Sequence, residues 1–329
     1  MKALVAQRLA GLEALALDEV AAPAPGPGEV LIGVGAVGLN LADVAALAGE
    51  RHPRPDLPFT PGLEVAGLVA ATGPDVSGFQ PGDRVAAFVG WGGLAEGAVA
   101  KAELCARLPD GMALTTAACL PVAYAGALIA LRERARLAAG ETVLVLGAGG
   151  HAGLAAVDIA KKQGARVIAV ASGEIRGSEA GERGADEVVD SSARPLSESV
   201  AALTHGAGVN VVYDPVGGDA FEMSLLTLAN GGRVISAGFA GGRIPRVNLP
   251  ALHARDAVLF AANTPLTVLA HPADAKAALA DVIAWANEAA FEPRIAAQFT
   301  LSDAKAGLDY VKSRRNTGAV IVTVGSESL

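Results

Sequence analysis

A glycine-rich turn between an apolar strand and a helix is the part of this chain best suited to hold a ligand. Residues 141–164 begin with an apolar strand, turn through glycines and continue in a helical pattern, and the apolar strand Ala165–Val170 follows at once. Together they form a strand–helix–strand unit of about 30 residues, the context in which a glycine turn is informative. Glycines let the backbone approach a diphosphate, whose charge meets the free N–H groups and the positive end of the helix. The segment therefore predicts a dinucleotide cofactor.

The turn fits two glycine patterns, and both place the same loop beneath the diphosphate. One pattern is Gly-x-Gly-x-x-Ala and the other is Gly-x-x-Gly-x-x-Gly, each starting at residue 147. His151 lies inside the loop and either contacts a phosphate or faces solvent. The residues expected at the cofactor are Gly147, Gly149, Gly150, His151, Ala152 and Gly153.

The end of the second strand indicates which nicotinamide cofactor is bound. An NAD site normally has Asp or Glu about 20 residues after the glycines, where it accepts hydrogen bonds from the adenine ribose. Here the strand ends in Val-Ala-Ser-Gly at residues 170–173, with no acid, and Arg176 follows. The Ser172 hydroxyl can donate to the additional phosphate of NADP and Arg176 can pair with it. The pair predicts NADPH; the alternative for Arg176 is a solvated charge at a helix start, near Glu174 and Glu179.

Composition and charge limit the classes of function. The 329 residues are enough for two domains, and with 52% hydrophobic and 18% charged residues they favour globular cores. A net charge of −8 argues against general affinity for nucleic acid. Two cysteines, Cys105 and Cys119, imply no disulfide framework and favour a reducing, cytoplasmic location. The apolar start is too short for a signal peptide and is predicted to form a first strand, and no membrane span is predicted.

The elements that must position these residues change character along the chain. Residues 1–118 contain short apolar runs separated by turns, which indicates a β-rich, barrel-like unit with strands at Glu29–Val37, Val65–Thr72 and Arg84–Val89. Residues 119–256 alternate helices with nearly continuous apolar strands, as a parallel sheet covered on both faces requires. The strands expected there are Thr142–Leu146, Ala165–Val170, Glu187–Val189, Val209–Tyr213, Arg233–Ala237 and Val258–Ala261, the last just beyond the boundary.

Residues 257–329 return to mixed structure. Helices are expected at about 273–289 and 302–313, followed by a strand at Ala319–Val324. We expect this tail to pack back onto the first unit.

This order of segments resembles the medium-chain dehydrogenase/reductase superfamily, and within it the zinc-free NADPH:quinone oxidoreductase branch, the zeta-crystallin-like proteins. The segments that carry the resemblance are residues 38–43, 61–67, 80–85, 117–121, the glycine turn, 214–218, 231–235 and 238–245. The resemblance implies an α/β fold, with a GroES-like β-rich catalytic domain (1–118 and 257–329) and a doubly wound Rossmann domain (119–256). By analogy with relatives it also implies a homodimer.

The resemblance also implies roles for particular residues. Asn40 would hydrogen-bond near the nicotinamide ribose or the substrate carbonyl, and Asp43 would tie its loop together; alternatively both only cap a turn. Gly238 and Phe239 would flank the nicotinamide, although Phe239 is as easily a core residue. Gly318 resembles the family's closing turn over the cofactor. In the family the residues at positions 172 and 176 hold the adenine-ribose phosphate, which agrees with the chemistry above.

Several family residues are absent from this chain. Zinc-dependent relatives have Cys at the position of Asn40 and His at the position of Leu63, so we expect no metal site. Tyrosines common in these reductases are missing at Ala45 and near Arg51, as is a threonine at Gly126. A tyrosine that often adds to the phosphate site is replaced by Ser191, and His52 is expected to face solvent.

These absences leave no obvious general acid, which favours a reaction that needs little proton transfer from the protein. We expect NADPH-dependent hydride transfer to a quinone or a similar electron-poor conjugated carbonyl, with Asn40 and Asp43 positioning groups only. One alternative is the reduction of an enone or enoyl thioester at carbon, which demands a proton donor. Another is an NADPH-binding protein with a structural or regulatory role and no turnover.

Overall fold

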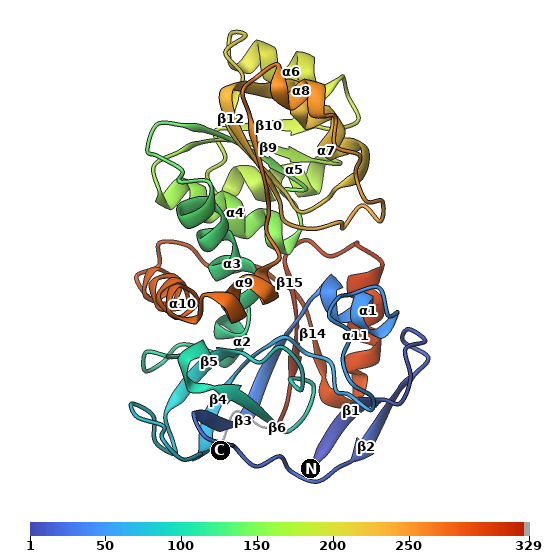
Figure 1. Cartoon of the computed structure of the whole chain (residues 1–329), viewed down its shortest axis with the longest axis vertical. Helices are drawn as coiled ribbons and strands as arrows, with labels where there is room; N and C mark the ends of the chain where they lie inside the picture. The colour runs from blue at the N-terminus through green and yellow to red at the C-terminus, as the bar shows by residue number, and fades with distance from the viewer. Residues whose placement is uncertain (326–329) are drawn as a thin grey trace. The chain divides into compact units, whose positions relative to one another are not determined.

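The computed structural model describes residues 1–325 and divides into two compact units (Figure 1). The first unit comprises Met1–Ala125 and Val268–Leu329, and the second comprises Gly126–Thr267. The domain boundaries placed after residues 118 and 256 from the sequence stay a prediction, whereas the compact units change over after residues 125 and 267.

The first unit is built on a seven-stranded sheet. Its strand order is β14-β15-β3-β4-β5-β7, and β6 also pairs with β3. Residues alternate between buried and half-buried along the first part of β3, as expected for a sheet with one face on the core. The strands are β3 (Glu29–Leu39), β4 (Glu64–Thr72), β5 (Arg84–Phe88), β6 (Gly97–Lys101), β7 (Cys105–Arg107), β14 (Ile295–Thr300) and β15 (Ala319–Thr323), and a separate pair is β1 (Lys2–Ala6) with β2 (Leu15–Glu19).

The C-terminal tail returns to the first unit, which confirms that expectation. β15 runs antiparallel to β3, with Val322 opposite Val37, and β14 runs parallel to β15. Leu308 and Val311, from the helix between β14 and β15, pack in the same hydrophobic core as Val37 and Val322. The helices of this unit are α1 (Leu41–Leu47), α2 (Leu114–Ala117), α10 (Pro272–Asn287) and α11 (Ala304–Lys312), and α9 (Thr264–Ala270) contains the second change of unit.

The second unit is a parallel six-stranded sheet in the order β10-β9-β8-β11-β12-β13. All six strands predicted from apolar runs are present: β8 (Thr142–Leu146), β9 (Arg166–Ala171), β10 (Glu187–Asp190), β11 (Val209–Asp214), β12 (Leu228–Ser236) and β13 (Val258–Ala261). The helices are α3 (Gly126–Leu128), α4 (His151–Lys162), α5 (Glu174–Glu182), α6 (Leu196–Leu203), α7 (Gly218–Ser224) and α8 (Leu249–His253). Strand order reverses at β8, and ligands of such sheets bind at the carboxyl ends of the strands beside that point.

One helix of the described chain, Leu114–Arg134, is long and apolar enough to cross a membrane by length and composition alone. Its most apolar window has a mean hydropathy of 1.8, and 78% of that window is buried inside the protein. The sequence does not predict it as a span because threonines, a proline and a tyrosine interrupt the apolar residues. Core helices of globular proteins pass the same test, so this helix alone is weak evidence for a membrane partner.

Candidate functional site

The glycine turn joins β8 to α4 and requires glycine for steric reasons. Gly147 has a φ of +60°, which favours glycine, and a Cβ there would lie 2.6 Å from the Val216 side chain. A Cβ on Gly153 would lie 2.2 Å from the carbonyl oxygen of Gly147, so α4 packs directly on the turn. The N-cap of α4 is Gly150, which has no side chain to satisfy the first N–H groups of the helix. The turn thus fits a bound diphosphate, the group for which these donors and the helix dipole are suited.

Arg176 packs against this turn. It lies in the first turn of α5, and a Cβ added to Gly149 would come within 2.4 Å of the Arg176 Cβ. The arginine is half-buried, whereas Ser172, at the end of β9, is exposed. The structure therefore brings Arg176 to the glycine turn, while its contact with a phosphate stays a prediction. His151 and Ala152 form the first residues of α4.

An acid also lies at this end of the sheet, on the neighbouring strand. Asp190 ends β10 opposite Ala171 of β9, and it accepts hydrogen bonds of 2.9 and 2.8 Å from the N–H and hydroxyl of Ser192. These hydrogen bonds, with a further one from the Gly173 N–H, lower the pKa of Asp190. This carboxylate was not predicted from the sequence, since only the end of β9 was expected to approach the adenine ribose.

The loop after β11 is fixed by a buried acid. Asp214 accepts hydrogen bonds from the N–H groups of Val216 (2.8 Å) and Gly217 (2.9 Å), and its burial raises its pKa to about 6. Gly238 approaches the same loop, since a Cβ there would lie 3.1 Å from the Pro215 carbonyl oxygen. Phe239 is 50% exposed, so the alternative that it belongs to the core is wrong.

The space expected for a threonine at position 126 is filled from another part of the chain. A Cβ on Gly126 would lie 2.9 Å from the hydroxyl oxygen of Thr264 and 3.1 Å from its methyl group. Both residues line a small cavity together with Ile129, Ala130, Arg134, Ala262 and Thr267. A hydroxyl is therefore present beside this helix although Gly126 carries none, which sequence spacing could not show.

In the first unit, Asn40 and Asp43 hold the start of α1. The Asn40 N–H donates to Asp43 Oδ2 (2.9 Å), and the Gly62 N–H donates to Asp43 Oδ1 (2.9 Å). Asp43 is fully buried, and this burial raises its pKa to about 6. Asp43 thus ties α1 to the loop before β4, and any role of Asp43 in positioning reacting groups stays a prediction.

Glu64 orients Asn40 and was missed as a site residue from the sequence. The Asn40 amide nitrogen donates to Glu64 Oε1 (2.7 Å) and, more weakly, to the Gly38 carbonyl (3.3 Å), and the Val122 N–H donates to Glu64 Oε2 (2.7 Å). Complete burial raises the pKa of Glu64 to about 8, and the charge of Asp43 adds to the shift. The Asn40 side chain is thus held by a carboxyl group that is largely neutral at pH 7, and Asn40 is also the N-cap of α1, so its role toward a cofactor or substrate stays a prediction.

The loop after α1, where a tyrosine was noted as missing, carries a cation stacked on an indole. The Arg51 guanidinium carbon lies 4.2 Å from the Trp91 ring centroid, and Trp91 meets Phe59 edge-on at 5.5 Å. His52 is exposed, as expected.

Gly318 lies in a tight turn before β15. Its φ is +106°, and a Cβ there would lie 2.5 Å from the Arg294 carbonyl oxygen. The Asn316 amide donates to the Gly318 carbonyl (2.8 Å), and the Arg294 guanidinium donates to the Thr317 carbonyl (3.1 Å). Its role toward a cofactor stays a prediction.

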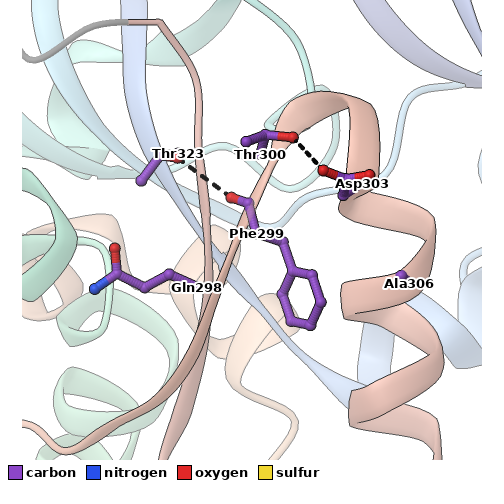
Figure 2. Close-up of a pocket in the computed structure, with 6 residues that line it drawn as sticks. All are labelled: Gln298, Phe299, Thr300, Asp303, Ala306 and Thr323. Carbon is purple, nitrogen blue, oxygen red and sulfur yellow. Dashed lines mark hydrogen bonds between the residues drawn. The ribbon is translucent and has the colours of Figure 1, made fainter.

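An open cavity elsewhere in the first unit contains none of the predicted site residues. It is lined by Gln298, Phe299, Thr300, Asp303, Ala306 and Thr323 (Figure 2). The Thr300 hydroxyl donates to Asp303 (2.7 Å), and the Thr323 hydroxyl donates to the Phe299 carbonyl (3.3 Å). Over residues 1–325, no group of three or more His, Cys, Asp or Glu side chains could hold a metal ion.

Comparison with known proteins finds relatives that are similar to this chain along nearly its whole length. Residues 26–110 match the family model described as alcohol dehydrogenase GroES-like domain, and residues 152–285 match the one described as zinc-binding dehydrogenase. Quinone oxidoreductase-like protein 2 of Bos taurus is 36% identical over 319 residues, which cover 94% of this chain and 89% of that protein. A quinone oxidoreductase of Pseudomonas aeruginosa is 32% identical over 313 residues, covering 95% and 96%.

A solved structure of similar fold also matches the chain over nearly its whole length. A mycobacterial protein complexed with NADPH superimposes with a TM-score of 0.91 at 30% identity, covering 98% of this chain and 100% of that one. The expected α/β architecture, a GroES-like domain with a Rossmann domain, is confirmed.

Proposed function

Because the chain belongs to the medium-chain dehydrogenase/reductase family, and is therefore an oxidoreductase of nicotinamide-dependent type, we propose that it uses NADPH to reduce a quinone or a similar electron-poor conjugated carbonyl. The observation that carries this proposal is the glycine turn at the point where strand order reverses, with Arg176 packed on Gly149. The similarity to quinone oxidoreductases along nearly the whole chain supports the choice of acceptor.

Each part of the site has a role in this reaction. The turn and the N-terminus of α4 would hold the diphosphate, and Ser172 and Arg176 would hold the adenine-ribose phosphate. When bound, NADPH supplies a hydride. Asn40, oriented by Glu64, would donate or accept a hydrogen bond near the reacting groups, and water would protonate the reduced oxygens.

We propose that the reaction proceeds without zinc. Position 63 is a leucine that is 2% exposed, and the side chain of Asn40 is engaged by Glu64 and Gly38 rather than directed at a metal. An apolar side chain and an amide in these places do not supply the thiolate and imidazole ligands that zinc requires.

The test is steady-state oxidation of NADPH with quinones and enones, each with and without a metal chelator. We expect quinone-dependent oxidation that the chelator leaves unchanged, with hydroquinone as the product. Reduction of the enone double bond alone would favour the alkene-reducing alternative. Activity lost on chelation and restored by zinc would contradict the proposal.

The preference for NADPH over NADH is expected to depend on the positive charge of Arg176 and the negative charge of Asp190, which act in opposite directions. Arg176→Ala should weaken NADPH binding by about 10-fold or more, since it removes a charge-assisted contact, and leave NADH binding nearly unchanged. Asp190→Asn should instead strengthen NADPH binding, because it removes a negative charge beside the end of β9. Fluorescence titrations with both cofactors measure this. Equal losses for NADPH and NADH in Arg176→Ala would show that the arginine does not contact the phosphate.

We also propose a homodimer formed through the second unit. β13 is an edge strand of the six-stranded sheet, and it leaves Val258 46% exposed. Ile244, Val247 and Leu249 are likewise exposed apolar side chains at 73%, 49% and 68%. An open apolar edge is commonly covered by pairing with a second copy. Light scattering should give twice the chain mass, and Val258→Lys should shift it toward the monomer; a monomeric wild type would contradict this.

We propose a cytoplasmic location, since both cysteines are free and buried.

A further inference from the structure

Arg51 is a cation whose hydrogen-bonding capacity the protein does not use. It lies in the loop that follows α1, and its Nη1 atom is buried without an acceptor among the described residues. Residues 1–325 also provide it with no ion pair within salt-bridge distance. Buried guanidinium N–H groups are normally hydrogen-bonded, because an unpaired one has lost its hydrogen bonds to water and gained none in the protein. The missing acceptor is what a ligand oxygen would supply.

The acid whose charge acts on Arg51 is already occupied. Asp43 attracts Arg51 by charge, but both of its oxygens accept backbone hydrogen bonds, from Asn40 and from Gly62. Arg54 in the same loop, by contrast, donates to the Gly49 carbonyl at 3.0 Å. Of the two arginines in this loop, only Arg51 is left with an unmet buried donor.

Trp91 provides a fixed support for this cation. The guanidinium carbon lies 4.2 Å from the indole centroid, and Phe59 meets the same indole edge-on. Backbone hydrogen bonds tie the Trp91 loop to the segment before β4, from Gly92 to Thr60 (2.7 Å) and from Leu94 to Pro61 (2.9 Å). Stacking on an aromatic ring holds a guanidinium while its N–H groups stay available in the plane of the cation.

We propose that Arg51, supported by Trp91, binds the quinone oxygen that becomes negatively charged during reduction. This inference rests on the proposed function. In that reaction the hydride brings two electrons and one hydrogen from the nicotinamide to the quinone, which becomes a hydroquinone monoanion. The anionic oxygen then takes one proton from water. Arginine keeps its proton at all relevant pH values, so Arg51 stabilises the charge and does not act as the acid.

A binding experiment tests this assignment without turnover. The chain has two tryptophans, so a Trp285→Phe background leaves Trp91 as the fluorescent reporter. The probes are 2-hydroxy-1,4-naphthoquinone, whose ionised oxygen mimics the hydroquinone monoanion, and neutral 1,4-naphthoquinone. Arg51→Gln should weaken binding of the anionic probe by about 10-fold or more, the size of one charge-assisted hydrogen bond, and change binding of the neutral probe less.

Arg54→Gln is the matched control, since it removes the same charge from the same loop. It should leave both probes bound as in the parent protein, and Arg51→Lys should retain part of the preference for the anion. Unchanged anion binding in Arg51→Gln, or an equal loss in Arg54→Gln, would overturn the assignment. Circular dichroism and NADPH titration show whether the variants are folded.

A kinetic measurement separates this inference from the proposed function. With a quinone acceptor, Arg51→Gln should lower kcat by about 100-fold, as loss of an oxyanion donor does, and leave the KM for NADPH unchanged. If the parent protein reduces no quinone, the proposed function fails, and the probe titration still decides whether Arg51 is an oxyanion site.

Discussion

Gly153→Ala is expected to reduce NADPH affinity by at least about 100-fold, the equivalent of two charge-assisted hydrogen bonds. The added Cβ would lie 2.2 Å from the Gly147 carbonyl oxygen and 2.7 Å from the Ala148 Cα. Both contacts are with backbone, so the turn or the start of α4 must move. The backbone N–H groups that would donate to the diphosphate would then no longer point toward it together. Overpacking of this kind also destabilises by roughly 1–3 kcal/mol.

Gly181→Ala is the matched control for this substitution. Gly181 lies in α5 of the same unit, and a Cβ there would make an ordinary contact of 3.8 Å with the Val188 side chain. We expect this variant to bind NADPH normally and to be slightly more stable, because alanine favours the helix. Isothermal titration with NADPH and urea unfolding measure both effects. A folded Gly153→Ala protein with undiminished affinity would mean that the turn does not hold the diphosphate.

The free energy of unfolding is expected to fall as pH rises from about 4.5 to about 8, because of Glu64. Burial raises the pKa of Glu64 from 4.5 to about 8, so the folded protein keeps a proton that the unfolded chain releases. The stabilisation is complete below pH 4.5 and is lost as pH passes through 8. A difference of one in pKa corresponds to about 1.4 kcal/mol, so the total is on the order of a few kcal/mol. Asp43, whose pKa is raised from 3.8 to about 6, acts in the same direction at lower pH.

Glu64→Gln should flatten this pH dependence, since the amide stays neutral throughout. At low pH the variant should be less stable by roughly 1–3 kcal/mol, because the amide nitrogen cannot accept from Asn40 or Val122 as a carboxyl oxygen does. Glu50→Gln, at an exposed position in the same unit, should retain the full slope. Urea unfolding across this pH range measures all three proteins. An unchanged slope in Glu64→Gln would mean that Glu64 is ionised in the folded state.

Much of the fold could be predicted because its signals are local. The strands at Thr142–Leu146 and Val258–Ala261 were predicted at the observed bounds, since each is a short apolar run between turns. β12 was predicted to begin at Arg233 but begins at Leu228. Its early part contains Asn230 and Gly231, which discourage a strand, yet Leu228 pairs with Val209 across a register shift. The start of β12 is therefore set by its pairing with β11 and not by the strand preference of its own residues.

The candidate site divides in the same way. The glycine turn and Arg176 were both singled out from the sequence because they belong to one strand–helix–strand unit, and the structure packs Arg176 on Gly149. The contacts of Glu64 with Val122 and of Arg51 with Trp91 join residues far apart in the chain. Thr264 fills the space beside Gly126 in the same manner, although the sequence showed only a missing threonine. Such partners depend on how strands and loops pack, which spacing along one sequence does not encode.

Anaerobic mixing of NADPH-loaded protein with a quinone tests the proposed hydride transfer most directly. The absorbance of reduced nicotinamide reports transfer of the hydride, and product analysis reports the acceptor. We expect one NADPH to be oxidised for each quinone reduced to hydroquinone. NADPH that binds but stays reduced with every quinone and conjugated carbonyl tried would contradict the proposed function, and would indicate a cofactor-binding protein without turnover.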